Sequence, residues 1–339
     1  MRELMRYRHL VMLLVCSGCF DFASGASLNS VRLDFMSTER AAEFLVEPDD
    51  FIIRLSPFDM SSRMKTDGVV RKEEFLKFIG GSAVAWTSQE SDAVSGIFAE
   101  LGVTTDSLNM NFPERINLIM TSGVEEGNAA YTRGNAIILQ RDKLSDYGEL
   151  KRTIAHEVFH LYTRHNPDMK NTLYNLIGFH KIDEIEFPNS LLAKKLTNPD
   201  APINDYAIQV TYQNASAWVV PILYSYSEEY LPEKGGEFFE YLQFKFVVVG
   251  KGAEAGTDRY DRAHPVIVDV SNLSGFFEQI GTNTNYIIHP EEILADNFAM
   301  LAWGVNQAKS PEILQRIRRA LSEPGVTQST AYDPDSPHQ

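Results

Sequence analysis

The chain of 339 residues has little cysteine, fewer basic than acidic residues, and no long apolar segment beyond its N-terminus. Both cysteines, Cys16 and Cys19, lie close to the start, so a chain that follows a cleaved signal would have no disulfide bond. The 31 Lys and Arg against 46 Asp and Glu give a net charge of −15, which argues against nucleic acid as a partner. Because no later segment approaches about 18 uninterrupted apolar residues, no transmembrane span is predicted for the mature chain.

The N-terminus has the composition of a secretory signal peptide. Arg2, Arg6 and Arg8 form a basic region, residues 10–20 form a short apolar region, and small residues that end at Ala26 offer a cleavage site. We therefore expect residues 1–26 to be a signal peptide and the mature protein to be secreted or to lie in the periplasm or cell envelope.

A lipid anchor is a second possibility for this terminus. Ser17, Gly18 and Cys19 resemble the end of a bacterial lipobox, in which the cysteine carries the lipid. Cys16 stands where such boxes usually carry leucine, so lipidation at Cys19 is the weaker prediction. Export is expected in either case.

Residues 156–160 read His-Glu-Val-Phe-His, an HExxH motif. On a helix, His156 and His160 lie on one face and can bind a single zinc ion. Glu157 stands between them, where a carboxylate can activate a zinc-bound water. The alternative is a buried amphipathic helix in which these three side chains make ordinary hydrogen bonds.

The motif lies in uncharged, mostly apolar surroundings from residue 153 to 162, and this stretch resembles the extended consensus of the zincin metallopeptidases. That resemblance implies an α+β fold with a zincin-like core, in which a small sheet with an edge strand packs beside the HExxH helix. It also implies one Zn²⁺ per chain, a peptide or protein substrate, and Glu157 as the general base.

Catalytic zinc usually takes a third protein ligand. Residues 289–299 are similar to the gluzincin pattern, in which a helix supplies a glutamate and an acidic residue follows one turn later. Glu292 would bind the metal, and Asp296 would accept a hydrogen bond from the far nitrogen of His156. Pro290 suits the first position of this helix, and the helix dipole accounts for Glu291.

Two other zincin patterns fit less well. The aspzincin pattern is only partly matched around Asp258 and Asp261, which a polar turn also explains. The metzincin pattern requires a glycine at Thr163 and a histidine at Asn166, and His165 is one residue out of register. We therefore favour Glu292 and keep the two aspartates as the alternative.

Further site residues are predicted on weaker grounds. Tyr286, His289 and, less favoured, His180 are candidate donors to a tetrahedral oxyanion. Asn135 and Ala136 resemble the Asn-Ala pair of thermolysin-like enzymes, on a strand expected to be the edge that holds extended substrate.

The remaining sequence predicts the domain organisation. Residues 27–110 are expected to form a mainly helical N-terminal region. Residues 111–322 are expected to form the catalytic domain, with a sheet-bearing insertion at about residues 167–285, and residues 323–339 a disordered tail.

The sequence thus predicts an exported zinc metallopeptidase. The alternatives are a non-peptidase zinc hydrolase and an envelope binding or assembly protein whose zinc site is structural or vestigial.

Overall fold

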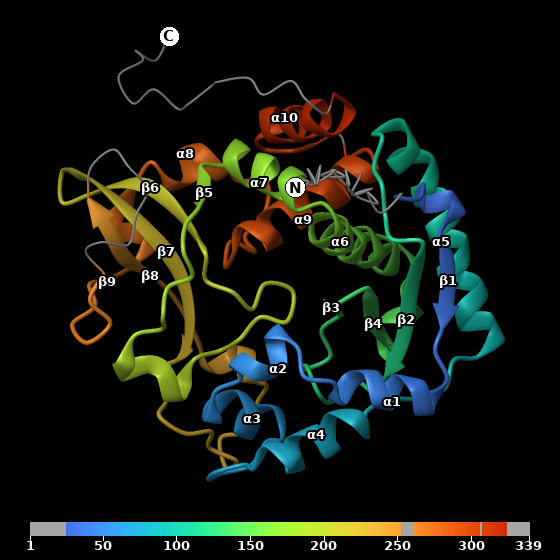
Figure 1. Ribbon diagram of the computed structural model, residues 1–339, viewed down its shortest axis with the longest axis horizontal. Helices are drawn as coiled ribbons and strands as arrows, with labels where there is room; N and C mark the ends of the chain where they lie inside the picture. The colour runs from blue at the N-terminus through green and yellow to red at the C-terminus, as the bar shows by residue number, and fades with distance from the viewer. Residues whose placement is uncertain (1–24, 252–259, 306, 324–339) are drawn as a thin grey trace, which may run out of the picture.

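The computed structural model describes residues 25–251, 260–305 and 307–323. Within these ranges the protein is an α+β fold with two small sheets, which confirms the predicted fold class. The sheets lie on opposite sides of the molecule, with α6, α7 and α9 near one end of the space between them and α2 and α3 near the other (Figure 1). Most of the expected signal peptide, both cysteines, Asp258 and nearly all of the expected tail lie outside the described residues.

The first sheet has the strand order β1-β2-β4-β3. Its strands are β1 (Arg32–Phe35), β2 (Arg115–Thr121), β3 (Tyr131–Arg133) and β4 (Ala136–Gln140). β1, β2 and β4 are parallel. β3 is antiparallel to β4, and the two are joined by a turn in which Gly134 has a φ of 54°. β2 and β4 are almost wholly buried, as expected of apolar strands that are covered on both faces.

This strand order corrects one expectation. The strand that begins at residue 135 was expected to be the edge of the sheet, but β4 lies between β2 and β3. The edges are β1 and, beside β4, β3, whose three residues are too few to give an alternating pattern in the sequence.

The described residues of the N-terminal region are mainly helical. Residues 32–35 form β1, which pairs with β2, and α5 contributes Val94 and Ile97 to the main core. This region therefore shares a sheet and a core with the residues that follow position 110. The helices are α1 (Thr38–Val46), α2 (Asp50–Arg54), α3 (Pro57–Arg63), α4 (Lys72–Gly80) and α5 (Ser88–Ser107).

The HExxH motif lies on α6 (Tyr147–His165), which the Asp146 side chain caps by accepting bonds from the next turn. The glutamate helix is α9 (Pro290–Ala302), which packs against α6. Ala155 on α6 and Ala295 and Ala299 on α9 are fully or almost fully buried, and small side chains allow two helices to approach closely. Two more helices, α7 (Pro167–Leu176) and α10 (Pro311–Ser322), pack on α9.

The predicted insertion contains a sheet, as expected. Its strand order is β10-β6-β7-β8-β9, and β5 pairs with the other end of β6. The elements are β5 (Phe179–Lys181), β6 (Tyr206–Tyr212), β7 (Ala215–Ser225), β8 (Leu242–Lys251), β9 (Ile267–Val268), β10 (Leu273–Ser274) and α8 (Phe276–Ile280). The described 3-10 helices are Leu28–Ser30, Arg141–Ser145, Asn189–Lys194, Phe238–Tyr241 and Val270–Asn272.

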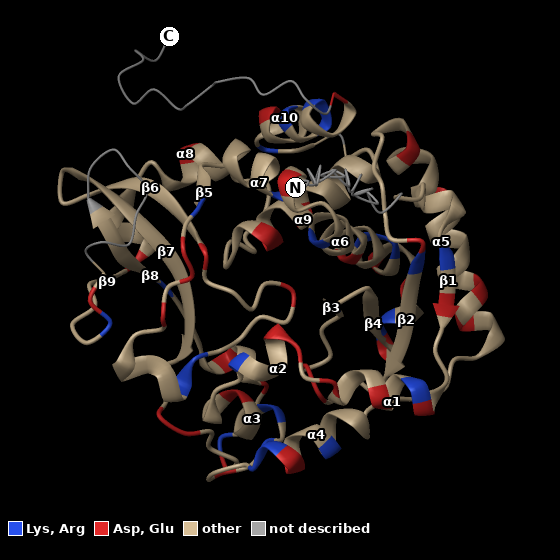
Figure 2. Ribbon diagram, in the orientation of Figure 1, with Lys and Arg blue, Asp and Glu red and all other residues tan. Residues whose placement is uncertain are grey.

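Charged residues of both signs are interspersed along α1, α3 and α4 (Figure 2). Among the described helices, none is long and apolar enough to cross a membrane.

Candidate metal centre

The two histidines of the motif lie one turn apart on α6 and face the same way. Their rings are 4.7 Å apart, centre to centre, at nearly a right angle. His160 is 1% exposed, and Glu157 is 3% exposed. The helix therefore presents two imidazoles and a carboxylate in the interior of the protein.

The glutamate helix brings Glu292 to these histidines. Glu292 Oε2 lies 3.0 Å from His156 Nε2 and 3.7 Å from His160 Nε2. The candidate ligand atoms of the three residues all lie within 4.8 Å of one another. Two neutral imidazoles and a carboxylate are the ligand set of several catalytic zinc sites.

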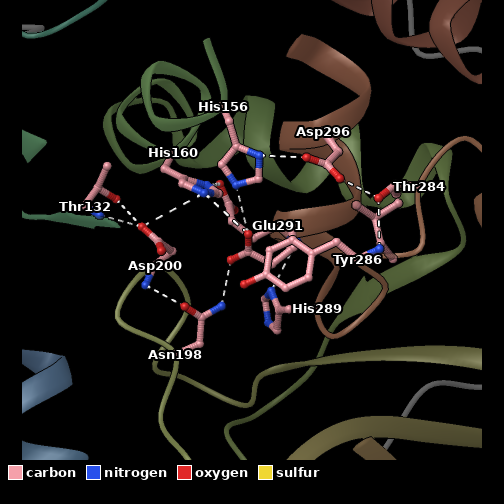
Figure 3. A network of polar contacts seen from close by, with 12 residues as sticks. Thr132, His156, His160, Asn198, Asp200, Thr284, Tyr286, His289, Glu291 and Asp296 are labelled. Carbon is pink, nitrogen blue, oxygen red and sulfur yellow. Dashed lines mark hydrogen bonds and ion pairs between the residues drawn. The ribbon is translucent and has the colours of Figure 1, made fainter. Parts of the chain in front are cut away.

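The second nitrogen of each imidazole also bonds to a carboxylate of α9 (Figure 3). His156 Nδ1 is 3.0 Å from Asp296 Oδ1, which is the contact predicted for Asp296. His160 Nδ1 is 3.0 Å from Glu291 Oε1. When a carboxylate binds the Nδ1 proton, the tautomer that leaves Nε2 free for a metal is favoured.

Glu291 was explained above as a helix-start residue alone, and that explanation was incomplete. Besides His160, its carboxylate accepts bonds from Thr163 at 2.5 Å and from Tyr174, and it pairs with Lys170 at 3.5 Å. Although burial opposes ionisation, Lys170 and His160 hold the pKa of Glu291 well below its ordinary value. Glu291 therefore orients His160 as Asp296 orients His156.

Two polar atoms in this cluster are buried without a partner. They are His160 Nε2 and Glu157 Oε2, among the unpartnered side-chain atoms of the described residues. A buried polar atom without a partner is costly, and a native fold usually supplies one. His160 Nε2 faces Glu292, so a metal bound there would satisfy it. The residues present thus fit a zinc ion held by His156, His160 and Glu292.

Asp200 is a site residue that the sequence did not indicate. Its Oδ1 accepts bonds of 2.7 Å from both the amide and the hydroxyl of Thr132 on β3, and it lies 4.0 Å from His160 Nε2. Burial and this carboxylate raise the pKa of Glu157 to about 8. Although burial opposes protonation of His160, Asp200 and Glu292 raise its pKa to about 9.

Asn198 also reaches the centre from the same loop. Its Nδ2 donates to Glu292 Oε1 over 2.7 Å, so Glu292 is held on both oxygens. Asp200 lies between two loop prolines in sequence, and Asn198 follows a threonine, which are ordinary loop signals. No spacing rule could have connected them to the motif.

The structure places Tyr286 beside the centre. Its ring lies 6.3 Å from that of His156, and the side chain is 41% exposed. Desolvation and the carboxylates of Glu292 and Asp200 raise the pKa of Tyr286 well above its ordinary value, so its hydroxyl keeps its proton. It can therefore donate to a developing negative charge.

His289 caps α9. Its Nδ1 accepts a bond of 3.1 Å from the amide of Glu291, so the neutral ring carries its proton on Nε2. Burial and Lys170 lower the pKa of His289 to about 4, which keeps the ring neutral near pH 7. With Asn198 it lines a small pocket that adjoins the centre.

The other predicted residues lie elsewhere. His180 packs against Trp218 on the second sheet, Asp261 pairs with the exposed His264, and His165 ends α6. Asn135 lies in the turn between β3 and β4, where its side chain bonds to Asn117 and to the carbonyl of Arg115.

Ala136 is the first residue of β4 and is fully buried. Because β4 is not an edge strand, the edge strand next to it is β3, and not the strand predicted to pair with substrate. The expectation drawn from the Asn-Ala resemblance was wrong about which strand lies at the edge of the sheet.

No protein-family model matches the chain, and no curated protein or solved structure is significantly similar to it.

Proposed function

We propose that this protein is a zinc-dependent metallopeptidase with a gluzincin-type ligand set and a zincin-like core. The observation that carries the proposal is the convergence of His156, His160 and Glu292 on one point, next to the unpartnered carboxylate oxygen of Glu157. A site with three protein ligands and a base beside it is the arrangement of a catalytic zinc centre.

Zinc bound by these ligands would supply Lewis acidity and lower the pKa of a coordinated water. Glu157 would take a proton from the attacking water and deliver it to the leaving amine. Its Oε2 accepts no bond within the described structure, and the positive charge of a bound metal would hold the carboxyl in the ionised form that a base requires. Asp296 and Glu291 would keep both imidazoles in the ligating tautomer.

Peptide as the substrate is supported by the edge strand β3, which contacts α6 and whose three residues are buried, with Asp200 bound to the Thr132 amide. The amide of Thr132 on this strand points away from β4, because it donates to Asp200. An extended peptide could pair with such an edge by backbone hydrogen bonds. Tyr286 and His289 are the candidate donors to the tetrahedral oxyanion.

We propose in addition that the protein is exported, on the strength of the basic and apolar segments before Ala26. Lipid attachment at Cys19 remains the alternative for the same terminus.

The test uses protein purified after expression of the full chain, as wild type, Glu292→Ala and Glu157→Gln. We expect about one zinc per wild-type chain, a marked loss of zinc in Glu292→Ala, and full zinc without peptide hydrolysis in Glu157→Gln. Full zinc in Glu292→Ala would contradict the ligand assignment. Hydrolysis of a peptide library by Glu157→Gln at the wild-type rate would contradict the mechanism.

A protein with a structural zinc site is the second candidate, because Asp200 could complete four protein ligands and such sites are closed. A binding or assembly protein should bind its partner equally well as wild type and Glu157→Gln, and neither form should cleave peptides. A non-peptidase hydrolase would lose turnover of a non-peptide substrate in Glu157→Gln.

A further inference from the structure

The loop of residues 197–200 crosses the candidate metal centre and is fixed at its start. Thr197 donates to both carboxylate oxygens of Asp59, from its amide over 3.0 Å and from its hydroxyl over 2.8 Å. Arg63 donates to the carbonyl of Thr197 over 3.2 Å. These contacts are buried, so the loop leaves the interior in a defined direction.

The loop is also fixed at its end, on β3 and α6. Asp200 accepts two bonds from Thr132, and Arg164 of α6 donates to the Asp200 carbonyl over 3.4 Å. Between the ends, Asn198 Oδ1 accepts from the Asp200 amide over 3.0 Å while its Nδ2 donates to Glu292. Figure 3 shows Asp200 and Asn198 facing the histidines from the side opposite Asp296.

The Asp200 carboxylate is therefore aimed at the metal centre. Its side chain is 8% exposed, and Oδ1 lies 4.0 Å from the nitrogen of His160 that has no hydrogen-bond partner. Ligand atoms of Asp200, His160 and Glu157 lie within 4.8 Å of one another, in a second group that shares His160 with the group of His156, His160 and Glu292. A carboxylate at this place lies beside both a metal ligand and the general base.

The same carboxylate occupies the edge of β3. The amide of Thr132 is a donor that an incoming peptide carbonyl would use, and Asp200 Oδ1 takes it in the resting protein. A carbonyl of a substrate strand and the Asp200 carboxylate therefore compete for the single N–H of Thr132.

We propose that Asp200 is a fourth protein ligand of the metal centre in the resting protein and an internal competitor of substrate. It closes the coordination position that a catalytic zinc site keeps open and holds the nearest donor of the edge strand. This inference rests on the proposed metallopeptidase function, because it assigns the state of that same site before substrate binds.

Competition of this kind multiplies the apparent affinity for a ligand by the fraction of time for which the site is open. If Asp200 occupies the position nine-tenths of the time, removing it tightens a metal-directed ligand by about tenfold. Substitution to asparagine suits the test, since an amide oxygen can still accept from Thr132 while a neutral amide is a poorer zinc ligand.

The experiment loads the full-length expressed protein with Co²⁺ and titrates it with acetohydroxamate, with the visible spectrum as the readout. Wild type, Asp200→Asn and Asp200→Ala are compared. Asp205→Asn is the matched control, because Asp205 lies just before β6, beyond the loop of residues 197–200, and its carboxylate pairs with Lys181. Circular dichroism checks that each variant is folded.

We expect the cobalt spectrum to change in both Asp200 variants and hydroxamate to bind about tenfold more tightly to them, with Asp205→Asn like wild type. Identical spectra and affinities in all four proteins would overturn the proposal, and so would a wild-type protein that binds no metal.

Peptide hydrolysis, measured in zinc-loaded samples, separates the Asp200 proposal from the proposed peptidase function. Changed spectra without hydrolysis in any protein would leave Asp200 as a ligand and refute the peptidase. Unchanged spectra together with peptide hydrolysis would refute Asp200 as a ligand and support the peptidase.

Discussion

Two buried clusters of charge lie close to each other in this protein, one around Arg63 and one around His160. In the first, Arg63 donates to Glu126 over 2.6 and 2.7 Å and to Asp59 over 2.7 Å. All three side chains are almost completely buried, and none of their polar atoms is without a partner. This cluster is complete without any further group.

The cluster around His160 is incomplete by comparison. It gathers carboxylates around two imidazoles, yet His160 Nε2 and Glu157 Oε2 have no partner. The His160 cluster therefore differs from the Arg63 cluster in having buried polar atoms that the described residues leave without a partner. The Arg63 cluster, through Thr197, also fixes the loop that carries Asp200, so the complete cluster supports the incomplete one.

The largest expected effect is on turnover. Replacing Glu157 by glutamine should lower kcat on a peptide substrate by about 10²- to 10⁴-fold, because it removes the general base and keeps the ligands. Zinc content should stay at the wild-type level. Glu149→Gln, at the exposed start of the same helix, is the control and should leave kcat unchanged. Loss of zinc in Glu157→Gln would show that this residue is a ligand instead.

The next largest effect is expected on stability, at the complete cluster. Replacing Arg63 by methionine leaves two buried carboxylates without their cation, which typically costs roughly 3–5 kcal/mol of the free energy of unfolding. Urea unfolding followed by circular dichroism measures the change. Arg71→Met removes an exposed pair with Glu74 and should change the free energy of unfolding far less than Arg63→Met. Equal losses in the two variants would refute the contrast between buried and exposed charge.

A smaller effect is expected from Glu291. Changing it to glutamine should weaken zinc binding by about 10- to 100-fold, because His160 loses the carboxylate that orients it. Competition with a chromophoric chelator gives the affinity. Glu278→Gln is the control, since Glu278 is an exposed glutamate in the first turn of another helix. An unchanged zinc affinity in Glu291→Gln would show that Glu291 stabilises only the start of α9.

The smallest effect concerns the pH dependence of stability. Burial, opposed by Arg63, raises the pKa of Glu126 to about 7 from an ordinary 4.5. Between these values the folded protein keeps a proton that the unfolded chain has released, so this group makes stability fall as pH rises. Urea unfolding between pH 4.5 and 7 should show a shallower fall in Glu126→Gln. A steeper fall would reverse the sign of this contribution.

Much of the site could be predicted from local sequence. The spacing of His156 and His160, and of Glu292 and Asp296, depends only on helix geometry, so the structure has all four on one centre. A strand at Asn135 and a sheet within about residues 167–285 were also expected. β1 was missed because its four residues are exposed or only partly buried.

The parts that were missed depend on contacts between distant segments. Whether Glu291 reaches His160 depends on how α9 docks on α6, and whether Thr132 faces outward depends on which strand ends the sheet. Asp200 comes from a loop with no periodic pattern, and its direction is fixed by Asp59 and Arg63.

The sequence by itself thus determined the helix that carries His156, Glu157 and His160 and the helix that carries Glu292, and its resemblance to the zincins implied the α+β class. The two helices follow from hydrophobic periodicity, capping and the repeat of the α-helix, which act over neighbouring residues. Only the tertiary structure decided that β3 is an edge strand, that Glu291 orients His160, and that Asp200 faces the centre. These arrangements depend on packing between segments far apart in the chain, which no local pattern encodes.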